Sequence, residues 1–147
     1  MHSPQAPPFL RRVMISIDRV DHLVLTVTDV DRAVDFYERI LGMEAVTFPG
    51  DRRAVRLGHQ TIKLHAASEL VEPTATHPVP GAANLCLVTN NAISEVQEHL
   101  RANDVRIEEG PVSRTGTDGS ITSLYLQDPD GNLIELARYD EPAEGTG

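Results

Sequence analysis

Tryptophan is absent from this sequence, and aromatic residues make up only 4% of it. The chain therefore has few aromatic side chains with which to form a pocket that holds its ligand by ring stacking. The chain also has a single cysteine, Cys86, so an internal disulfide bridge is excluded. Because Cys86 stands between Leu85 and Leu87 in an apolar run, we predict a buried and unreactive thiol in the core.

Basic residues are scarce as well. The chain has 13 Lys and Arg against 22 Asp and Glu, a formal net charge of −9. Binding to nucleic acid or to an anionic membrane needs a basic surface, so we expect neither partner. No apolar run approaches the roughly 18 residues of a membrane helix. The first residues also lack the order of a secretory signal peptide, and we therefore expect a cytoplasmic protein.

The length of 147 residues suits one globular domain with a core of its own. Residues 1–16 and 140–147 are rich in Pro, Gly, Ser and charged residues. Segments of this composition bury too little apolar surface to offset the entropy of ordering, so we predict disordered tails at both ends. The folded domain is predicted to span residues 17–139.

The predicted domain contains an internal repeat. Module one, residues 18–67, has the pattern of a strand, a helix and three strands, and module two, residues 82–139, repeats that order after a proline-rich linker over 68–81. His22 and Asn84, which open the two modules, are 62 residues apart, and the same spacing relates the helices and the strands after them. We predict an α+β fold made of tandem βαβββ modules.

Turn and cap residues set the expected boundaries of these elements. In module one a helix should begin at Asp29 or Asp31 and end at Gly42. In module two Asn91 should cap the helix, and residues 110–119 have the composition of a turn. Strands are predicted over residues 19–27, 43–48, 53–57, 60–65, 83–88, 105–107, 121–126 and 133–139.

Residues 128–136 combine a tight Asp-Pro-Asp-Gly turn with a strand that carries one carboxylate. Strand alternation places Glu135 on the same face as Leu133 and Ala137. On an apolar face a carboxylate needs protonation, a basic partner or a metal ion, whereas on a solvated face it needs none of these. The residues alone leave these alternatives open.

Several motifs resemble one known family, the vicinal oxygen chelate superfamily, which includes glyoxalase I, bleomycin-binding proteins, fosfomycin-resistance proteins and extradiol dioxygenases. The resemblance covers roughly residues 18–139 and implies a cleft-shaped, partly open mixed sheet with helices on the outside and a divalent metal on the inner face. Shorter motifs are similar to the subgroup of glyoxalase domain-containing protein five and its bacterial virulence-protein relatives. The superfamily motifs are residues 21–25 (DHLVL), 33–37 (AVDFY), 41–43 (LGM) and 128–135 (DPDGNLIE), and those of the subgroup are residues 77–81, 107–112 and 114–116.

The resemblance also implies a set of metal ligands. Members that use a metal take one ligand from the first strand of a module and a carboxylate from the last strand of the second, positions that His22 and Glu135 occupy. Lys63 stands where glyoxalase I has a glutamate, and His65, on the same strand face, could fill that vacancy. Asn84 replaces a histidine found in dioxygenases. The implied ion is iron, manganese, zinc or nickel, bound by His22, His65 and Glu135.

The resemblance implies a metalloenzyme that chelates two neighbouring oxygens of a small molecule and stabilises an oxyanion or enediolate, with Glu135 as the catalytic base. Asn84, Arg114 and Tyr125 are candidate substrate contacts, although the loop composition around Arg114 favours a solvated arginine over a substrate contact, and Tyr125 could be a core or rim ring instead. The alternative is a binding or resistance protein of the antibiotic type that uses no metal. The modules could pair within one chain or across a homodimer.

Overall fold

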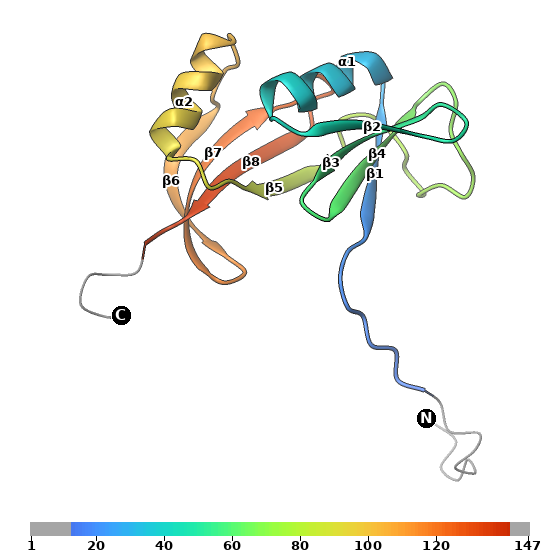
Figure 1. Cartoon of the computed structure of the whole chain (residues 1–147), viewed down its shortest axis with the longest axis horizontal. Coiled ribbons are helices and arrows are strands. Elements are labelled where there is room, and N and C mark those ends of the chain that lie inside the picture. The colour runs from blue at the N-terminus through green and yellow to red at the C-terminus, as the bar shows by residue number, and fades with distance from the viewer. Residues whose placement is uncertain (1–12, 142–147) are drawn as a thin grey trace.

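The computed structural model describes residues 13–141. Its strands form two four-stranded sheets, and the helical segments lie on the same side of both (Figure 1). The predicted α+β fold of tandem βαβββ modules is confirmed. The elements are β1 (His22–Val27), α1 (Val30–Asp35), the π-helical segment η2 (Phe36–Ile40), β2 (Glu44–Phe48), β3 (Arg52–Leu57), β4 (Gln60–Ala66), β5 (Asn84–Val88), α2 (Ile93–Ala102), β6 (Glu109–Gly116), β7 (Gly119–Gln127) and β8 (Leu133–Tyr139).

The two sheets have the same internal plan. Their strand orders are β1-β4-β3-β2 and β5-β8-β7-β6. In each sheet the first and last strands of the module pair in parallel, and the remaining neighbours are antiparallel. As a result β1 and β5 are edge strands, each with one unpaired side. None of the helices in residues 13–141 has the length and apolar character needed to cross a membrane.

Module one follows its predicted boundaries closely. The Asp29 carboxylate caps α1 by accepting a hydrogen bond from the Arg32 N–H at 3.1 Å. The helical segment continues through η2 and is followed by Gly42, whose φ of +70° is a conformation that glycine adopts without the steric cost of a Cβ. The buried face of this helix, which includes Val34 and Tyr37, packs on the sheet.

Module two departs from the prediction in one strand. No strand forms over residues 105–107, where Val105 and Ile107 pack partly buried against the core. Instead β6 extends through most of the segment that we expected to be a turn, residues 110–119. It pairs with β7 in antiparallel fashion, with a bulge between Glu109 and Val112. Tertiary pairing thus overrides the low strand propensity of glycine and proline in this segment.

The beginning of α2 also differs from the prediction. The N-cap residue is Ala92 rather than Asn91. Asn91 lies one residue before the N-cap position, where its N–H donates a hydrogen bond to the hydroxyl of Thr89 at 3.1 Å. The Ala92 N–H is satisfied by the carboxylate of Glu95 at 3.1 Å, so the side chain inside the first turn takes over part of the capping function.

The turn between β7 and β8 joins the two modules. Its backbone closes as predicted, since the Asp128 N–H donates to the Asn132 carbonyl at 3.0 Å. Buried Asp128 also accepts a 2.6 Å hydrogen bond from the Tyr37 hydroxyl in module one. Asp130 accepts the backbone N–H of Thr28 at 3.0 Å. The turn of module two therefore anchors the start of the helix in module one.

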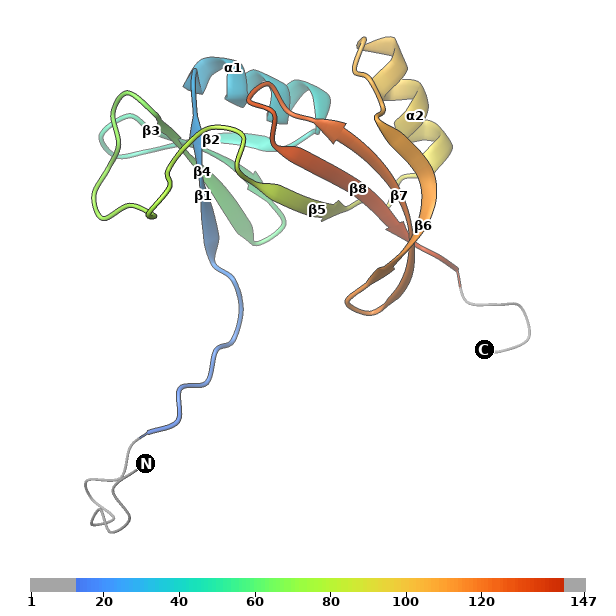
Figure 2. The same cartoon turned by 180° about the vertical axis from the view of Figure 1, so that it is seen from behind.

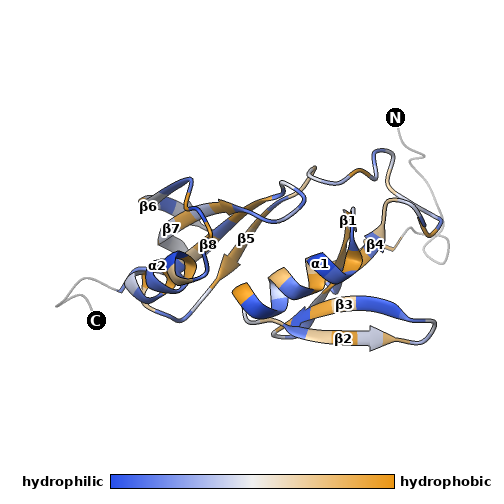
Figure 3. Ribbon diagram, turned by 90° about the horizontal axis from the view of Figure 1, so that it is seen from above, coloured by the Kyte–Doolittle hydropathy of each residue, from blue (hydrophilic) through white to orange (hydrophobic). Residues whose placement is uncertain are grey.

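A single apolar cluster runs between the helices and the two sheets. Leu124, Leu126 and Ile134 are fully buried in module two, and Val27 and Val55 are fully buried in module one. Each strand and helix carries both hydrophobic and hydrophilic residues, as the view from above shows (Figure 3). Burial on the helix side leaves the opposite side of each sheet without a helical cover (Figure 2).

We call this uncovered side of each sheet its open face. Strand register and alternation define its members. The open face of module one contains His22, Val24, Thr26, Glu44, Val46, Phe48, Arg52, Ala54, Arg56, Thr61, Lys63 and His65. The open face of module two contains Asn84, Cys86, Val88, Glu109, Arg114, Ile121, Ser123, Tyr125, Leu133, Glu135 and Ala137.

Candidate functional site

Glu135 occupies the middle of the open face of module two. It lies directly between Cys86 on β5 and Tyr125 on β7 in the sheet register. Its Oε2 accepts a 2.6 Å hydrogen bond from the hydroxyl of the fully buried Ser123. Within residues 13–141 no basic side chain lies within 4 Å of the Glu135 carboxylate. The carboxylate is therefore oriented by a neutral donor and free to accept a cation.

Cys86 is exposed, and our prediction of a buried core thiol is wrong. Alternation turns Leu85 and Leu87 toward the core, so Cys86 points to the open face of the edge strand β5. Partial burial raises the pKa of the thiol, and the negative charge of Glu135 raises it further. Sequence analysis missed this neighbour of Glu135 because Cys86 was judged by its apolar neighbours in the chain.

The two predicted histidine ligands both lie on the open face of module one. His22 is exposed at the start of β1, and its Nδ1 is 2.9 Å from the Asp21 carboxylate. In metal sites a carboxylate often forms a hydrogen bond with one ring nitrogen of a histidine in this way, while the other ring nitrogen, here Nε2, binds the ion. His65 is half-buried on β4. Burial lowers the pKa of its imidazole, and the positive charges of Arg52 and Lys63 lower it further.

The register separates these histidines along the sheet. His22 pairs with Thr61, whereas His65 pairs with Thr26, four residues further along both strands. That step corresponds to about 13 Å at the usual rise per residue of a strand. Glu135 lies in the other sheet. Within residues 13–141 of one chain, no group of three or more His, Cys, Asp or Glu side chains is placed to hold a metal ion. The three-ligand set stays a prediction.

The candidate substrate contacts differ in whether their side chains already have hydrogen-bond partners. Arg114 belongs to β6 rather than to a loop. Its guanidinium donates to the Tyr125 hydroxyl at 3.1 Å and to the Glu109 carboxylate at 3.0 Å, bonds that raise its pKa. A substrate anion would therefore have to displace Glu109. Tyr125 shares the open face of Glu135, as a cleft residue should, and Asn84 is exposed at the start of the neighbouring strand β5.

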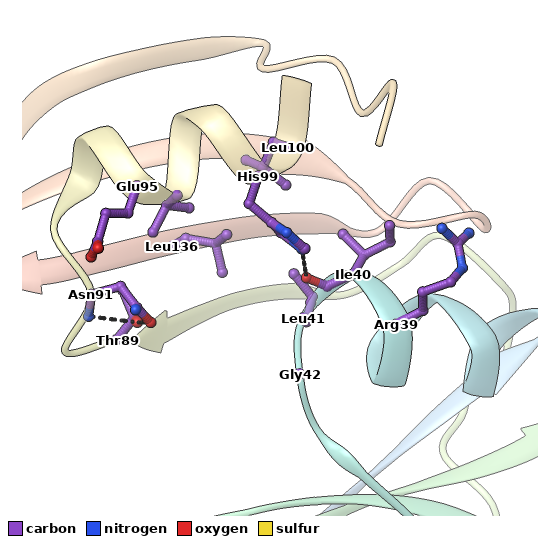
Figure 4. A pocket seen from close by; sticks show the side chains of 11 residues that line it. Arg39, Ile40, Leu41, Gly42, Thr89, Asn91, Glu95, His99, Leu100 and Leu136 are labelled. Carbon is purple, nitrogen blue, oxygen red and sulfur yellow. Dashed lines mark hydrogen bonds between the residues drawn. The ribbon is translucent and has the colours of Figure 1, made fainter. Parts of the chain in front are cut away.

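A separate cavity lies on the helix side, between η2 and α2 (Figure 4). It measures about 350 Å³, and none of the predicted site residues lines it. His99 borders it and is within hydrogen-bond distance of the Ile40 carbonyl through Nε2 at 2.8 Å. The bond joins residues 59 positions apart in different modules, a contact that the spacing of the sequence did not indicate.

A protein-family model described as the Glyoxalase/Bleomycin resistance protein/Dioxygenase superfamily matches residues 19–136. Virulence protein STM3117 of Salmonella typhimurium is 47% identical over 127 residues, covering 86% of this chain and 88% of that protein. Its crystal structure aligns with a TM-score of 0.84 and 48% identity, covering 86% of this chain and all of the other.

Two further relatives carry names from the same family. Glyoxalase domain-containing protein RDO1 of Mycosarcoma maydis is 45% identical over 127 residues, covering 86% of this chain and 72% of that protein. Lactoylglutathione lyase of Escherichia coli O157:H7 is 30% identical over 138 residues, covering 88% of this chain and 98% of that protein.

Proposed function

Because this chain belongs to the Glyoxalase/Bleomycin resistance protein/Dioxygenase superfamily, we propose that it is a small metalloenzyme acting on a substrate with two neighbouring oxygens. The ion would be held by His22 from module one and Glu135 from module two. The observation that carries this proposal is the Glu135 carboxylate, which is oriented by Ser123 and has no basic side chain within 4 Å among the described residues.

The side chains present are of the chemical types that bind divalent ions. Imidazole and carboxylate are a common ligand pair for zinc, iron and manganese. His22 has Asp21 behind it, and Glu135 has Ser123 beside it, so each candidate ligand has a second residue that can hold its orientation. When bound, the ion would supply Lewis-acid polarisation of the substrate oxygens.

The surrounding side chains would do the rest of the chemistry. Glu135 is the candidate base that accepts a proton from the substrate, and the Ser123 hydroxyl holds its second oxygen in place. Tyr125, directly opposite Glu135 in the sheet, would contact the substrate through its ring, while Asn84 would donate or accept a hydrogen bond. Arg114 would position Tyr125 rather than meet the substrate itself.

Assembly of this site requires the open faces of the two modules to approach each other. Among residues 13–141 of one chain they do not bring three ligands together. We therefore include a homodimer in the proposal, in which module one of one copy faces module two of the other. Exposed apolar residues on these faces support it, since Val24 is 47% and Val88 59% exposed.

Metal stoichiometry tests this function. Protein purified without a histidine tag or chelator should contain divalent metal by elemental analysis. His22→Ala and Glu135→Gln should both lose it, because each removes a ligand, while exposed His77 in the linker provides a control in His77→Ala. His65→Ala decides whether this third residue contributes. Full metal content in both His22→Ala and Glu135→Gln would refute the site.

The alternative function is small-molecule binding without metal. Lys63 and Asn84 favour it, because they occupy positions where metal-dependent relatives are expected to have ligands. Under this alternative the wild-type protein would contain no stoichiometric metal and would not gain any from iron, manganese, zinc or nickel salts. A thermal-stability screen against the four ions separates the two functions, since a ligand specific to the native state raises the melting temperature.

A further inference from the structure

The open face of module one is basic, although the protein as a whole carries a formal charge of −9. Arg52, Arg56 and Lys63 all project from it, on two neighbouring strands. Lys63 is the only lysine in the sequence. His22 and His65 share the same face. This concentration of basic groups contrasts with the acidic composition of the chain.

The three cations surround one point on the sheet. Lys63 lies directly opposite Ala54 in the antiparallel pair β3–β4, and Arg52 and Arg56 are the next residues of β3 on the same face. Diagonal neighbours of this kind have their Cα atoms about 7–8 Å apart. The Lys63 ammonium also lies over the Phe48 ring, 5.4 Å from its centroid.

Most arginines elsewhere in the described chain are neutralised by a partner. Arg32, Arg39, Arg53, Arg114 and Arg138 each have a carboxylate within 4 Å, as does Arg19. Among residues 13–141, Arg52, Arg56 and Lys63 have none within that distance. Two carboxylates are nearby: Asp21 is bonded to His22, and Glu44 lies opposite Arg56 in the register.

A cavity of about 290 Å³ opens beside Arg56 and Lys63, whereas Arg52 is not among the residues that line it. Its lining includes Lys63, Arg56 and His22, together with Phe48, Thr61, His59 and Asp21. The Arg56 Nε donates to the Gly58 carbonyl at 3.4 Å, a long bond that leaves the other guanidinium N–H groups available. The cavity therefore offers an ammonium, a guanidinium and the Thr61 hydroxyl, the donors that bind carboxylate and phosphate groups.

We propose that Arg56 and Lys63 form an anion site that binds the carboxylate or phosphate group of a small substrate, with Arg52 adding to the positive charge of the same face. As a substrate site it rests on the proposed function, because it would place the anionic group beside His22. Anion binding itself requires only module one. The physical driving force is the mutual repulsion of three cations on one face, which a bound anion relieves. The lowered pKa of His65, to which Arg52 and Lys63 contribute after burial, is consistent with such a field.

The single lysine gives this proposal a direct readout. Reductive methylation with ¹³C-formaldehyde keeps the positive charge and labels only Lys63 and the N-terminal amine. Titration with inorganic phosphate, and separately with malonate, should shift the Lys63 signal in a saturable way at constant ionic strength. A larger response to phosphate or to malonate identifies which group the site prefers. Chloride at equal ionic strength is the control titrant.

Calorimetry on unlabelled variants tests the residues. Lys63→Gln and Arg56→Gln should each weaken binding of the preferred probe by about tenfold or more, since each removes one charged donor. Arg101→Gln, on the exposed surface of α2, is the matched control and should bind as wild type does. Unchanged affinity in both Lys63→Gln and Arg56→Gln, or no saturable shift with either probe, would overturn the proposal.

The Glu135→Gln variant separates this inference from the proposed metal site. It should lose metal yet keep the anion site, because Glu135 belongs to the other module. A different result is that the wild-type protein binds neither probe whereas Glu135→Gln binds phosphate. Glu135 of a second copy would then neutralise Lys63 in the wild-type protein, and the anion site would be refuted. Wild-type protein that contains no metal and gains none from iron, manganese, zinc or nickel salts, yet binds phosphate, would refute the metalloenzyme and leave the anion site standing.

Discussion

At the scale of single residues, Glu135 and Cys86 are coupled across the β5–β8 pair. They lie directly opposite each other on the open face, and no helix covers them. A thiol reacts as its thiolate, so anything that disfavours the negative charge slows the reaction. Here partial burial does so first and the Glu135 carboxylate second. Cys86 is therefore accessible to reagents but poorly ionised near neutral pH.

We expect iodoacetamide to label Cys86 in the native protein, at a rate that keeps rising at pH values above the ordinary pKa of a thiol. In Glu135→Gln the coulombic contribution disappears, the thiol pKa falls, and labelling at pH 7.5 should become several-fold faster. Glu108→Gln, a carboxylate outside the open face, is the control. Equal rates in wild type and Glu135→Gln, measured by mass spectrometry, would mean that the charge of Glu135 does not reach the thiol.

Tyr37 forms a buried hydrogen bond between the two modules. Its buried hydroxyl donates to Asp128, and burial raises its pKa first, with the Asp128 hydrogen bond adding to the shift. Tyr37→Phe leaves a buried carboxylate short of one donor, which costs about 2 kcal/mol. For a chain of this size the melting temperature should fall by roughly 4–8 °C. Tyr125→Phe, which removes an exposed hydroxyl bond, should change it little; equal losses in both would contradict this role for Tyr37.

At the scale of elements, strand β6 depends on a close backbone approach. Gly110 has φ of +116°, and a Cβ added there would lie 2.4 Å from the Ser123 carbonyl oxygen on β7. Backbone on a paired strand cannot move aside without breaking the ladder. The crowded carbonyl belongs to Ser123, whose side chain orients Glu135. Packing of β6 on β7 and the geometry of the candidate site are thus connected.

Substitution of two glycines separates steric contact from backbone strain. Gly110→Ala and Gly119→Ala both force alanine into positive φ, but a Cβ at Gly119 meets nothing within 4 Å. Gly119→Ala should cost about 1–2 kcal/mol from strain alone. Gly110→Ala should cost clearly more in chemical denaturation, because the clash adds to the strain. Similar free energies of unfolding for the two variants would show that β6 can shift away from β7.

At the scale of the whole molecule, the open faces of both sheets expose apolar side chains next to charged ones. Val24 and Val88 project from the edge strands β1 and β5. Full burial of one valine side chain contributes about 1.5–3 kcal/mol. Burial against a second copy would therefore stabilise a dimer in which the open faces are the inner surfaces, as the proposed function requires.

Val88→Arg tests that arrangement. The substitution places a charge on the proposed interface, so the dissociation constant of the dimer should rise by at least about tenfold in sedimentation equilibrium. The far-ultraviolet circular dichroism should not change, because Val88 is already 59% exposed in the single chain. Arg101→Glu on α2 controls for a change of surface charge. An unaltered dimer in Val88→Arg would place the interface elsewhere, and a wild-type monomer would remove it.

Features that depend on neighbours in the chain could be read from the sequence by itself. The apolar periods give the helices of both modules and all strands but β6, and the Asp29 cap and the 128–132 turn are local hydrogen-bond patterns. Alternation likewise places His22, Lys63 and His65 on one face, and Glu135 on the other module's equivalent face. Each of these requires only the geometry of one strand or one helical turn.

Features that depend on which strands meet were decided by the tertiary structure alone. Cys86 is exposed because β5 is an edge strand, and Arg114 is occupied because β6 brings Glu109 and Tyr125 beside it. The distance between His22 and His65 follows from the register of β1 on β4. Edge position and register arise from pairing between residues far apart in the chain, and a one-residue shift would change them all without altering any local pattern.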